Sequence, residues 1–138
     1  MRPVPSRRQG GIALLEAMLA IVILGIGLLG TIGLQARAYS ALSDAGMRAE
    51  ATLAGEKLLG VMTADAANLA GYNLPENGTP GAAIAPWVTE TRAAIPGAIV
   101  SVNVTRQQFQ TQVDIAIRWQ RKANTAQNRH FVTAYIAN

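Results

Sequence analysis

The feature that most constrains this 138-residue chain is an apolar run at residues 12–34 that carries a single charge, Glu16. At a rise of about 1.5 Å per residue, a helix of that length spans about 35 Å, enough to cross the hydrocarbon core of a bilayer. Three basic residues precede the run: Arg2, Arg7 and Arg8. Because positive flanking charge stays on the cytoplasmic side, we expect a single-pass segment with a cytoplasmic N-terminus and the remaining chain outside.

Two simpler interpretations of the apolar run are secretion signals. Ala36-Arg37-Ala38 offers a small-x-small cleavage site, and Ser6-Arg7-Arg8 is similar to part of a twin-arginine signal. A secretory signal, however, has an apolar core of roughly 7 to 15 residues, which is shorter than this run. The residues after the two arginines, Gln9-Gly10-Gly11, are not the apolar ones expected there. A plain signal anchor fits the length better, but it gives no reason for Glu16.

Glu16 is the fifth residue of the apolar run. A charged residue costs about 2.5–3.5 kcal/mol at the centre of a membrane helix and less near its end. The helix macrodipole favours an acid in the first turns, and this could be its whole role. Alternatively, cleavage between Gly11 and Ile12 would create an α-amine that pairs with the carboxylate, within one chain or between neighbours. The residues alone leave both roles open.

The sequence around Glu16 resembles the type III signal of type IV prepilins and pseudopilins. A basic leader ends in Gly11 and is followed by Ile12-Ala13-Leu14-Leu15-Glu16, although the family usually has phenylalanine where Ile12 stands. The resemblance implies that a prepilin peptidase removes residues 1–11 as a leader peptide and that Ile12 becomes N-methylated. It also implies that Glu16 neutralises the N-terminal amine of a neighbouring subunit during assembly. The continuation to Gln35 is similar to PilV-type minor pilins.

The same resemblance implies a structural role. A minor pilin of this type takes part in type IV pilus assembly, in a priming or tip complex. The implied partners are other minor and major pilins, the prepilin peptidase, an inner-membrane assembly platform and the lipid bilayer. The implied location is the inner membrane, with the C-terminal domain in the periplasm, and then the pilus. Minor pseudopilins of type II secretion share much of the pattern, so this second machine stays open.

Four glycines interrupt the apolar run: Gly25, Gly27, Gly30 and Gly33. Each weakens a helix by about 1 kcal/mol relative to alanine in water. The last three recur every third residue, so they lie close together on the helix surface, where small residues let neighbouring helices approach. The alternative is that glycine is simply common in membrane helices. Related filament pilins melt part of this region on assembly, and we expect Gly25 and Gly27 to mark that place here.

The rest of the chain predicts a second helical half and a small sheet. Residues 35–70 lack proline, which favours the amphipathic half of one long helix. Its expected apolar stripe is Leu42, Ala45, Ala49, Leu53, Leu59, Met62, Ala66 and Leu69. Residues 71–97 are rich in glycine and proline and predict a loop. Alternating patterns predict strands at 100–105 and 109–120, and residues 130–137 form a third candidate strand with both faces mixed, within an antiparallel sheet at 98–138. We therefore expect an α+β, pilin-like fold: a long helix, with its first half transmembrane, packed on three to four antiparallel strands.

The sequence offers little for catalysis, so we expect neither an enzyme nor a cofactor or metal. The one histidine, His130, lacks the partners of a catalytic or metal site, and we expect an ordinary surface group. Without the three leader arginines, nine basic residues face eight acidic ones, which supports nucleic acid only weakly. Four basic residues surround the last hairpin, either as solvated charges or as a contact for another pilin, the cell surface or DNA: Arg118, Arg121, Lys122 and Arg129.

Overall fold

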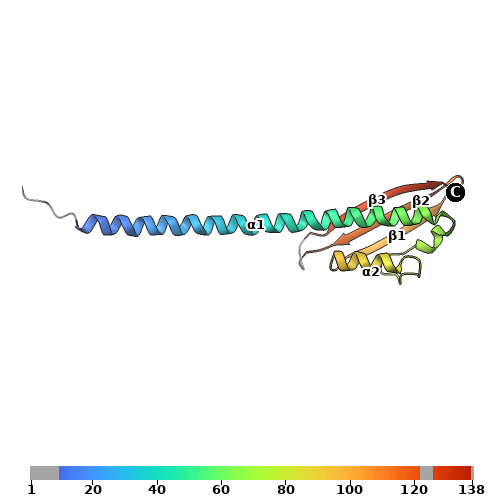
Figure 1. The fold of residues 1–138 in the computed structure, drawn as a ribbon, viewed down its shortest axis with the longest axis horizontal. Helices are drawn as coiled ribbons and strands as arrows, with labels where there is room; N and C mark the ends of the chain where they lie inside the picture. Colours follow the sequence, from blue (N-terminus) through green and yellow to red (C-terminus); the bar gives the residue numbers. More distant parts are fainter. Residues whose placement is uncertain (1–9, 122–125, 138) are drawn as a thin grey trace, which may run out of the picture. The chain divides into compact units, whose positions relative to one another are not determined.

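The computed structural model describes residues 10–121 and 126–137 (Figure 1). These residues form α1 (Gly10–Ala64), the 3-10 segment η1 (Ala66–Tyr72), α2 (Ala85–Ala94), β1 (Ile99–Arg106), β2 (Gln110–Trp119) and β3 (Asn128–Ala137). The chain divides into two compact units, one up to Leu42 and one from Ser43 onward.

Within the described residues, the first unit is the part of α1 that ends at Leu42. The large apolar side chains from Ile12 to Leu34 are 55–71% exposed. A continuous apolar surface of this size requires lipid or other helices around it. The described chain holds one helix that is long and apolar enough to cross a membrane, and it includes the residues 12–34 that the sequence predicts to do so.

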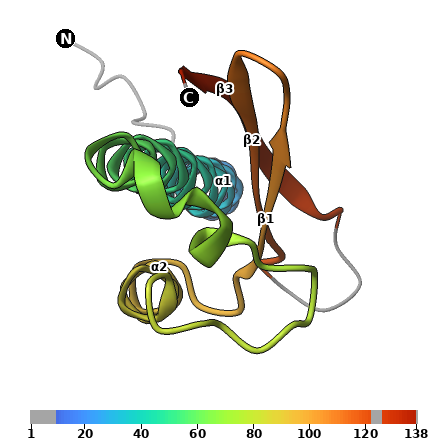
Figure 2. The ribbon, with the colours of Figure 1, turned by 90° about the vertical axis from the view of Figure 1, so that its right-hand side faces the viewer.

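The second unit consists of a helical layer, formed by α1 residues 43–64 and the shorter helices, packed on an antiparallel sheet. The sheet order is β1-β2-β3. Figure 2 shows that α1, η1 and α2 lie on the same side of the sheet. Val113, Ile115 and Ile117 of β2 are completely buried and share one core with Leu58 and Met62 of α1. The predicted fold class, a long helix packed on a small antiparallel sheet, is confirmed with three strands.

The strand predictions are confirmed, with ends that shift by up to two residues. In β2, alternate residues from Thr111 to Trp119 are buried, as their alternating polarity indicates. Val102 pairs with Ile115, and Ile115 pairs with Val132, so one side of all three strands faces the core. The opposite side of the sheet is the outer face.

The buried face of α1 differs from the predicted stripe. Leu42 and Leu53 are 69% and 59% exposed, so their assignment to the packed face is wrong. The buried or half-buried residues along the centre of the packed face are Met47, Ala51, Gly55, Leu58 and Met62, with Ala54 and Leu59 partly buried beside them, so Leu59 and Met62 of the predicted stripe are confirmed. The spacing of the five central residues, three and four apart, is that of one helical face. Small side chains at two of these positions let the helix approach the sheet closely, whereas leucine alone does not mark the contact face.

α1 ends at Ala64, six residues before the predicted boundary at residue 70. Asp65 leaves helical geometry with φ −115° and ψ 44°, and η1 is itself interrupted at Asn68. The Asp65 carboxylate accepts a hydrogen bond from the Tyr72 hydroxyl at 2.9 Å and one from the Asn68 amide at 3.5 Å. A short polar side chain that bonds locally in this way competes with continuation of the helix.

The prediction of a loop throughout residues 71–97 is wrong because α2 lies inside that segment. Pro86 occupies the first turn of α2, where proline fits because the N–H it lacks has no helical partner. Trp87, Val88 and Thr91 are buried and anchor the helix to the core. After α2, Gly97 adopts φ 76°, a left-handed conformation that glycine takes without strain before β1 begins.

Candidate assembly segment

The residues with predicted processing and assembly roles lie in the first turns of α1. Gly11, Ile12 and Glu16 all follow the start of the helix at Gly10. Ile12 and Glu16 are four residues apart, so they share one face at a separation of about 6 Å along the axis. Glu16 is exposed, and no salt bridge in the described part of the chain includes it. A carboxylate without a described cationic partner therefore lies one turn from the residue that cleavage would make N-terminal.

The four glycines of the first unit lie on an open helix surface. A Cβ added at Gly25, Gly27, Gly30 or Gly33 would meet nothing within 4 Å. The surface beside each glycine can thus accept the backbone of another helix at short distance. All four lie within the unbroken span of α1. Melting at Gly25 and Gly27 concerns the assembled state and stays a prediction.

The predicted basic cluster is only partly assembled. Arg118 forms an ion pair with Glu76, and the Arg121 Nε atom lies 3.6 Å from Asp44 Oδ1. Arg129 is opposite Arg118 in the β2–β3 register, and its guanidinium lies 5.7 Å from the centre of the Phe131 ring. Lys122, the fourth member, lies outside the described residues. Two of the three described cations have acidic partners, so this hairpin is not a free basic patch.

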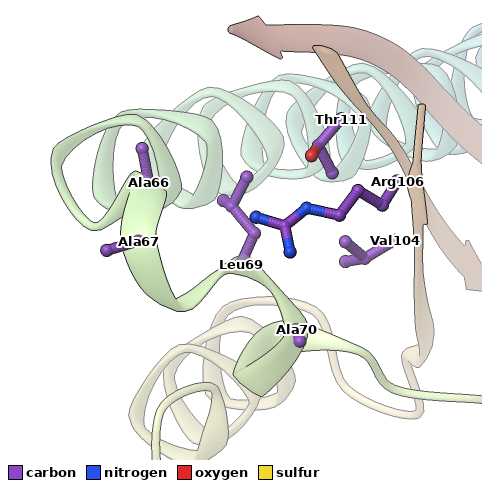
Figure 3. A pocket seen from close by; sticks show the side chains of 7 residues that line it. All are labelled: Ala66, Ala67, Leu69, Ala70, Val104, Arg106 and Thr111. Atoms are coloured by element: carbon purple, nitrogen blue, oxygen red, sulfur yellow. The ribbon is translucent and has the colours of Figure 1, made fainter. Parts of the chain in front are cut away.

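Two hollows in the described part of the second unit are lined in part by polar side chains. The first, of about 120 Å³, is lined by η1, Val104, Arg106 and Thr111, and Figure 3 shows the Arg106 side chain directed toward Leu69. The second, of about 210 Å³, lies between α1 and α2, where Lys57 pairs with Glu90. No group of three potential metal-ligating side chains occurs among the residues that the structure describes. Neither hollow is lined by a histidine or a cysteine of the described chain.

His130 is not the ordinary surface group that its position predicts. Its ring faces the core side of β3, and its Nε2 atom is buried without a hydrogen-bond partner among the described residues. The ring packs beside Gly55, where an added Cβ would lie 3.4 Å from Nε2. The sequence could not indicate this contact, because it depends on which turn of α1 crosses β3.

Sequence reasoning also missed two polar contacts that hold the second unit together. The Trp87 indole N–H donates to the Ala54 carbonyl at 2.8 Å and thereby links α2 to α1. In the second contact, the Tyr72 hydroxyl donates to the Asp65 carboxylate at 2.9 Å. Burial, this hydrogen bond and the charge of Asp65 raise the pKa of the Tyr72 hydroxyl above its usual value. The residues after Pro86 are compatible with a helix, and this was the sequence signal that could have indicated α2 and its contact with α1. No sequence signal indicates the second.

Comparison with known proteins identifies the N-terminal segment. Residues 6–32 match the family model described as the prokaryotic N-terminal methylation motif. No curated protein and no solved structure matches the chain significantly. The matched range includes Gly11, Ile12 and Glu16, together with most of the exposed apolar helix. The long apolar helix that follows is consistent with a membrane anchor, and the motif supports a subunit of the pilin or pseudopilin type. The N-terminal segment of this chain is a prepilin-type methylation motif.

Proposed function

We propose that this chain is a minor pilin of the PilV type, which takes part in type IV pilus assembly within a priming or tip complex. One combination carries the proposal: a methylation motif at residues 6–32 opens an exposed, membrane-length apolar helix. A small α+β unit follows this helix. The first part suits storage in the inner membrane and then packing among other helices. The second unit would be exposed on the outside.

Processing would supply the partner that Glu16 lacks. Hydrolysis of the peptide bond after Gly11 releases the leader and leaves a protonated α-amine on Ile12. In a filament core, the Glu16 carboxylate of one subunit would pair with that amine on a neighbour. An uncompensated buried charge costs about 3–5 kcal/mol when its partner is removed, so the pair would favour one register between subunits.

Mass spectrometry of the mature chain tests the processing step. We expect 127 residues, that is 138 less the 11 of the leader, starting with methylated Ile12. Gly11→Val places a branched side chain beside the scissile bond and should leave the leader attached. Gly10→Ala, one residue further from that bond, is the matched control and should be cleaved. A mature chain that keeps its leader, or that starts near Tyr39, contradicts the proposal.

Glu16→Gln tests the assembly step because it removes the charge and keeps the shape. We expect incorporation into filaments to fall by about tenfold or more. Glu56→Gln is the control, since Glu56 is an exposed carboxylate on the same helix, outside the apolar run. Normal numbers of surface pili with normal incorporation of the Glu16→Gln chain would remove the proposed role.

A minor pseudopilin of type II secretion is the second candidate, since the methylation motif supports both kinds of subunit. Deletion of the gene distinguishes the two machines. Loss of surface pili with normal protein secretion supports the pilus. Loss of secretion with normal pili supports the pseudopilin. The genes that neighbour this one provide an independent indication.

A pilus-borne module that binds DNA or a surface is less well supported. The acidic partners of Arg118 and Arg121 reduce the positive charge that a nucleic acid would meet. A gel-shift assay on the full chain in detergent, with Arg118→Glu and Arg129→Glu variants, tests this function. Salt-sensitive binding that both variants abolish would favour it.

A further inference from the structure

The sheet of the second unit has two edges, and β3 forms one of them. The direction of its backbone groups follows from the register. Val102 of β1 donates to and accepts from Leu74 at 2.8 Å, so its N–H and C=O point away from β2. Its cross-strand neighbour Ile115 must then bond toward β3, where it pairs with Val132. The odd-numbered residues of β3 therefore direct their N–H and C=O groups outward.

Among the described residues, other segments of the chain cover the β1 edge of the sheet but not the β3 edge. Leu74 and the side chain of Asn73 cover the β1 edge, the latter by accepting from Val104 N–H at 3.2 Å. In both views α2 lies on the side of β1 (Figure 1, Figure 2). Within the described residues, no hydrogen bond is formed by the outward groups of β3. These groups belong to Arg129, Phe131, Thr133, Tyr135 and Ala137.

The β3 edge also lacks the usual devices that prevent pairing with another strand. β3 is ten residues long and contains no proline or glycine. It pairs with β2 without a bulge across its whole length. On its outer face, Phe131 and Tyr135 are 52% and 57% exposed. Natural edge strands are normally short, bulged or charged along their length, and this one carries a charge at Arg129 alone.

We propose that the β3 edge accepts an extended strand from a neighbouring subunit of the filament. The outward N–H and C=O groups, spaced along the whole edge, match the backbone of a polypeptide in β conformation. The strand would present apolar side chains to Phe131 and Tyr135. Arg118 is already paired with Glu76, whereas no ion pair among the described residues includes Arg129, so an acidic side chain of the incoming strand would lie beside Arg129. This inference rests on the proposed filament role.

Photocrosslinking in cells that make the filament tests the location of the edge. A p-benzoylphenylalanine probe replaces Phe131, and the matched control replaces Phe109, an aromatic residue that is 79% exposed in the β1–β2 turn. We expect the probe at position 131 to capture an extended segment of another pilin subunit, identified by peptide mass spectrometry. Capture at position 109 should be about tenfold weaker.

Proline substitution tests whether the backbone carries the contact. Tyr135→Pro removes an outward N–H that β2 does not use, so proline is tolerated by the sheet itself. Tyr135→Ala removes the same side chain and keeps the N–H. With the probe at position 131, we expect Tyr135→Pro to reduce capture by about tenfold and Tyr135→Ala by less than about threefold. Retention of buried tryptophan fluorescence shows that both variants are folded.

The outcomes separate the two proposals. Cleavage after Gly11 and incorporation of the chain, without capture at position 131, overturn the edge inference and leave the filament role intact. Capture of a second copy of this chain alone, or equal effects of Tyr135→Pro and Tyr135→Ala, also overturns it. An uncleaved chain defeats the filament role, and the edge inference with it.

Discussion

Gly55 offers a sharp test of how closely α1 packs on the sheet. A Cβ built on Gly55 would lie 3.4 Å from His130 Nε2 and 3.6 Å from both His130 Cδ2 and Val132 Cγ2. These are ordinary contact distances, so one methyl group fits and further carbon atoms directed there do not. Gly60, in the same helix, has nothing within 4 Å of an added Cβ. The two glycines therefore separate helix propensity from packing.

The expected magnitudes follow from these distances. Alanine is about 1 kcal/mol better than glycine in a helix interior, so Gly55→Ala and Gly60→Ala should both stabilise the second unit by about that amount. Valine is better than glycine by about 0.3 kcal/mol in an open helix, and this is the expected gain for Gly60→Val. At Gly55 the additional carbons would overpack the contact at a cost of about 1–3 kcal/mol. Gly55→Val should therefore destabilise, by roughly 2 kcal/mol relative to Gly60→Val.

Urea unfolding of the full chain in a mild detergent measures these differences. The sequence contains two tryptophans, Trp87 and Trp119, and both are buried in the second unit, so their fluorescence reports its unfolding. The free energy of unfolding is compared among the four variants and the parent chain at one detergent concentration. If Gly55→Val is as stable as Gly60→Val, α1 does not pack against His130 and Val132 as described, and the reasoning fails.

Three further predictions use the same unfolding assay. Because the pKa of Tyr72 is raised in the folded state, the stability that it contributes is complete below its ordinary value of 10.0 and is lost as the pH rises through the folded-state pKa. Tyr72→Phe should therefore lose less stability than the parent as the pH rises above about 10, and an equal loss would contradict a raised pKa of Tyr72 in the folded state. Lys57→Met should change the free energy of unfolding by less than about 1 kcal/mol, because Lys57 and Glu90 are 56% and 61% exposed; a larger loss would contradict a screened surface pair. Ile115→Ala should cost about 2–5 kcal/mol, since Ile115 is completely buried in β2, and a cost near zero would refute its place in the core.

Features that depend on one stretch of chain were predictable from sequence. The apolar run was predictable as a membrane-length helix, because its length and composition disfavour most soluble elements. The alternation in β2 identified its buried face, because side chains in a strand point to opposite sides in turn. Gly11, Ile12 and Glu16 were identifiable as a candidate processing segment, because the motif is local and contiguous.

Other features required knowledge of what each segment meets. Pro86 was interpreted as a loop residue, although proline is equally suited to the first turn of α2. Leu53 was assigned to the packed face of α1, whereas Gly55 lies there, because close approach of a helix to a strand selects small residues rather than the most apolar ones. The acidic partner of Arg118 lies 42 positions earlier in the chain, at Glu76, which no local pattern indicates.

The sequence by itself determined that this chain has a membrane-length helix with one carboxylate near its start, and a sheet with a buried β2. Only the tertiary structure decided which face of α1 is buried, which arginines are neutralised, and that β3 has an open edge while Leu74 covers β1. The physical reason is that the spacing of apolar residues in a sequence indicates that one face of a helix or strand is kept from water. It does not indicate which other segment covers that face. Charge pairing and strand order depend on segments that are brought together by folding over long separations in the chain.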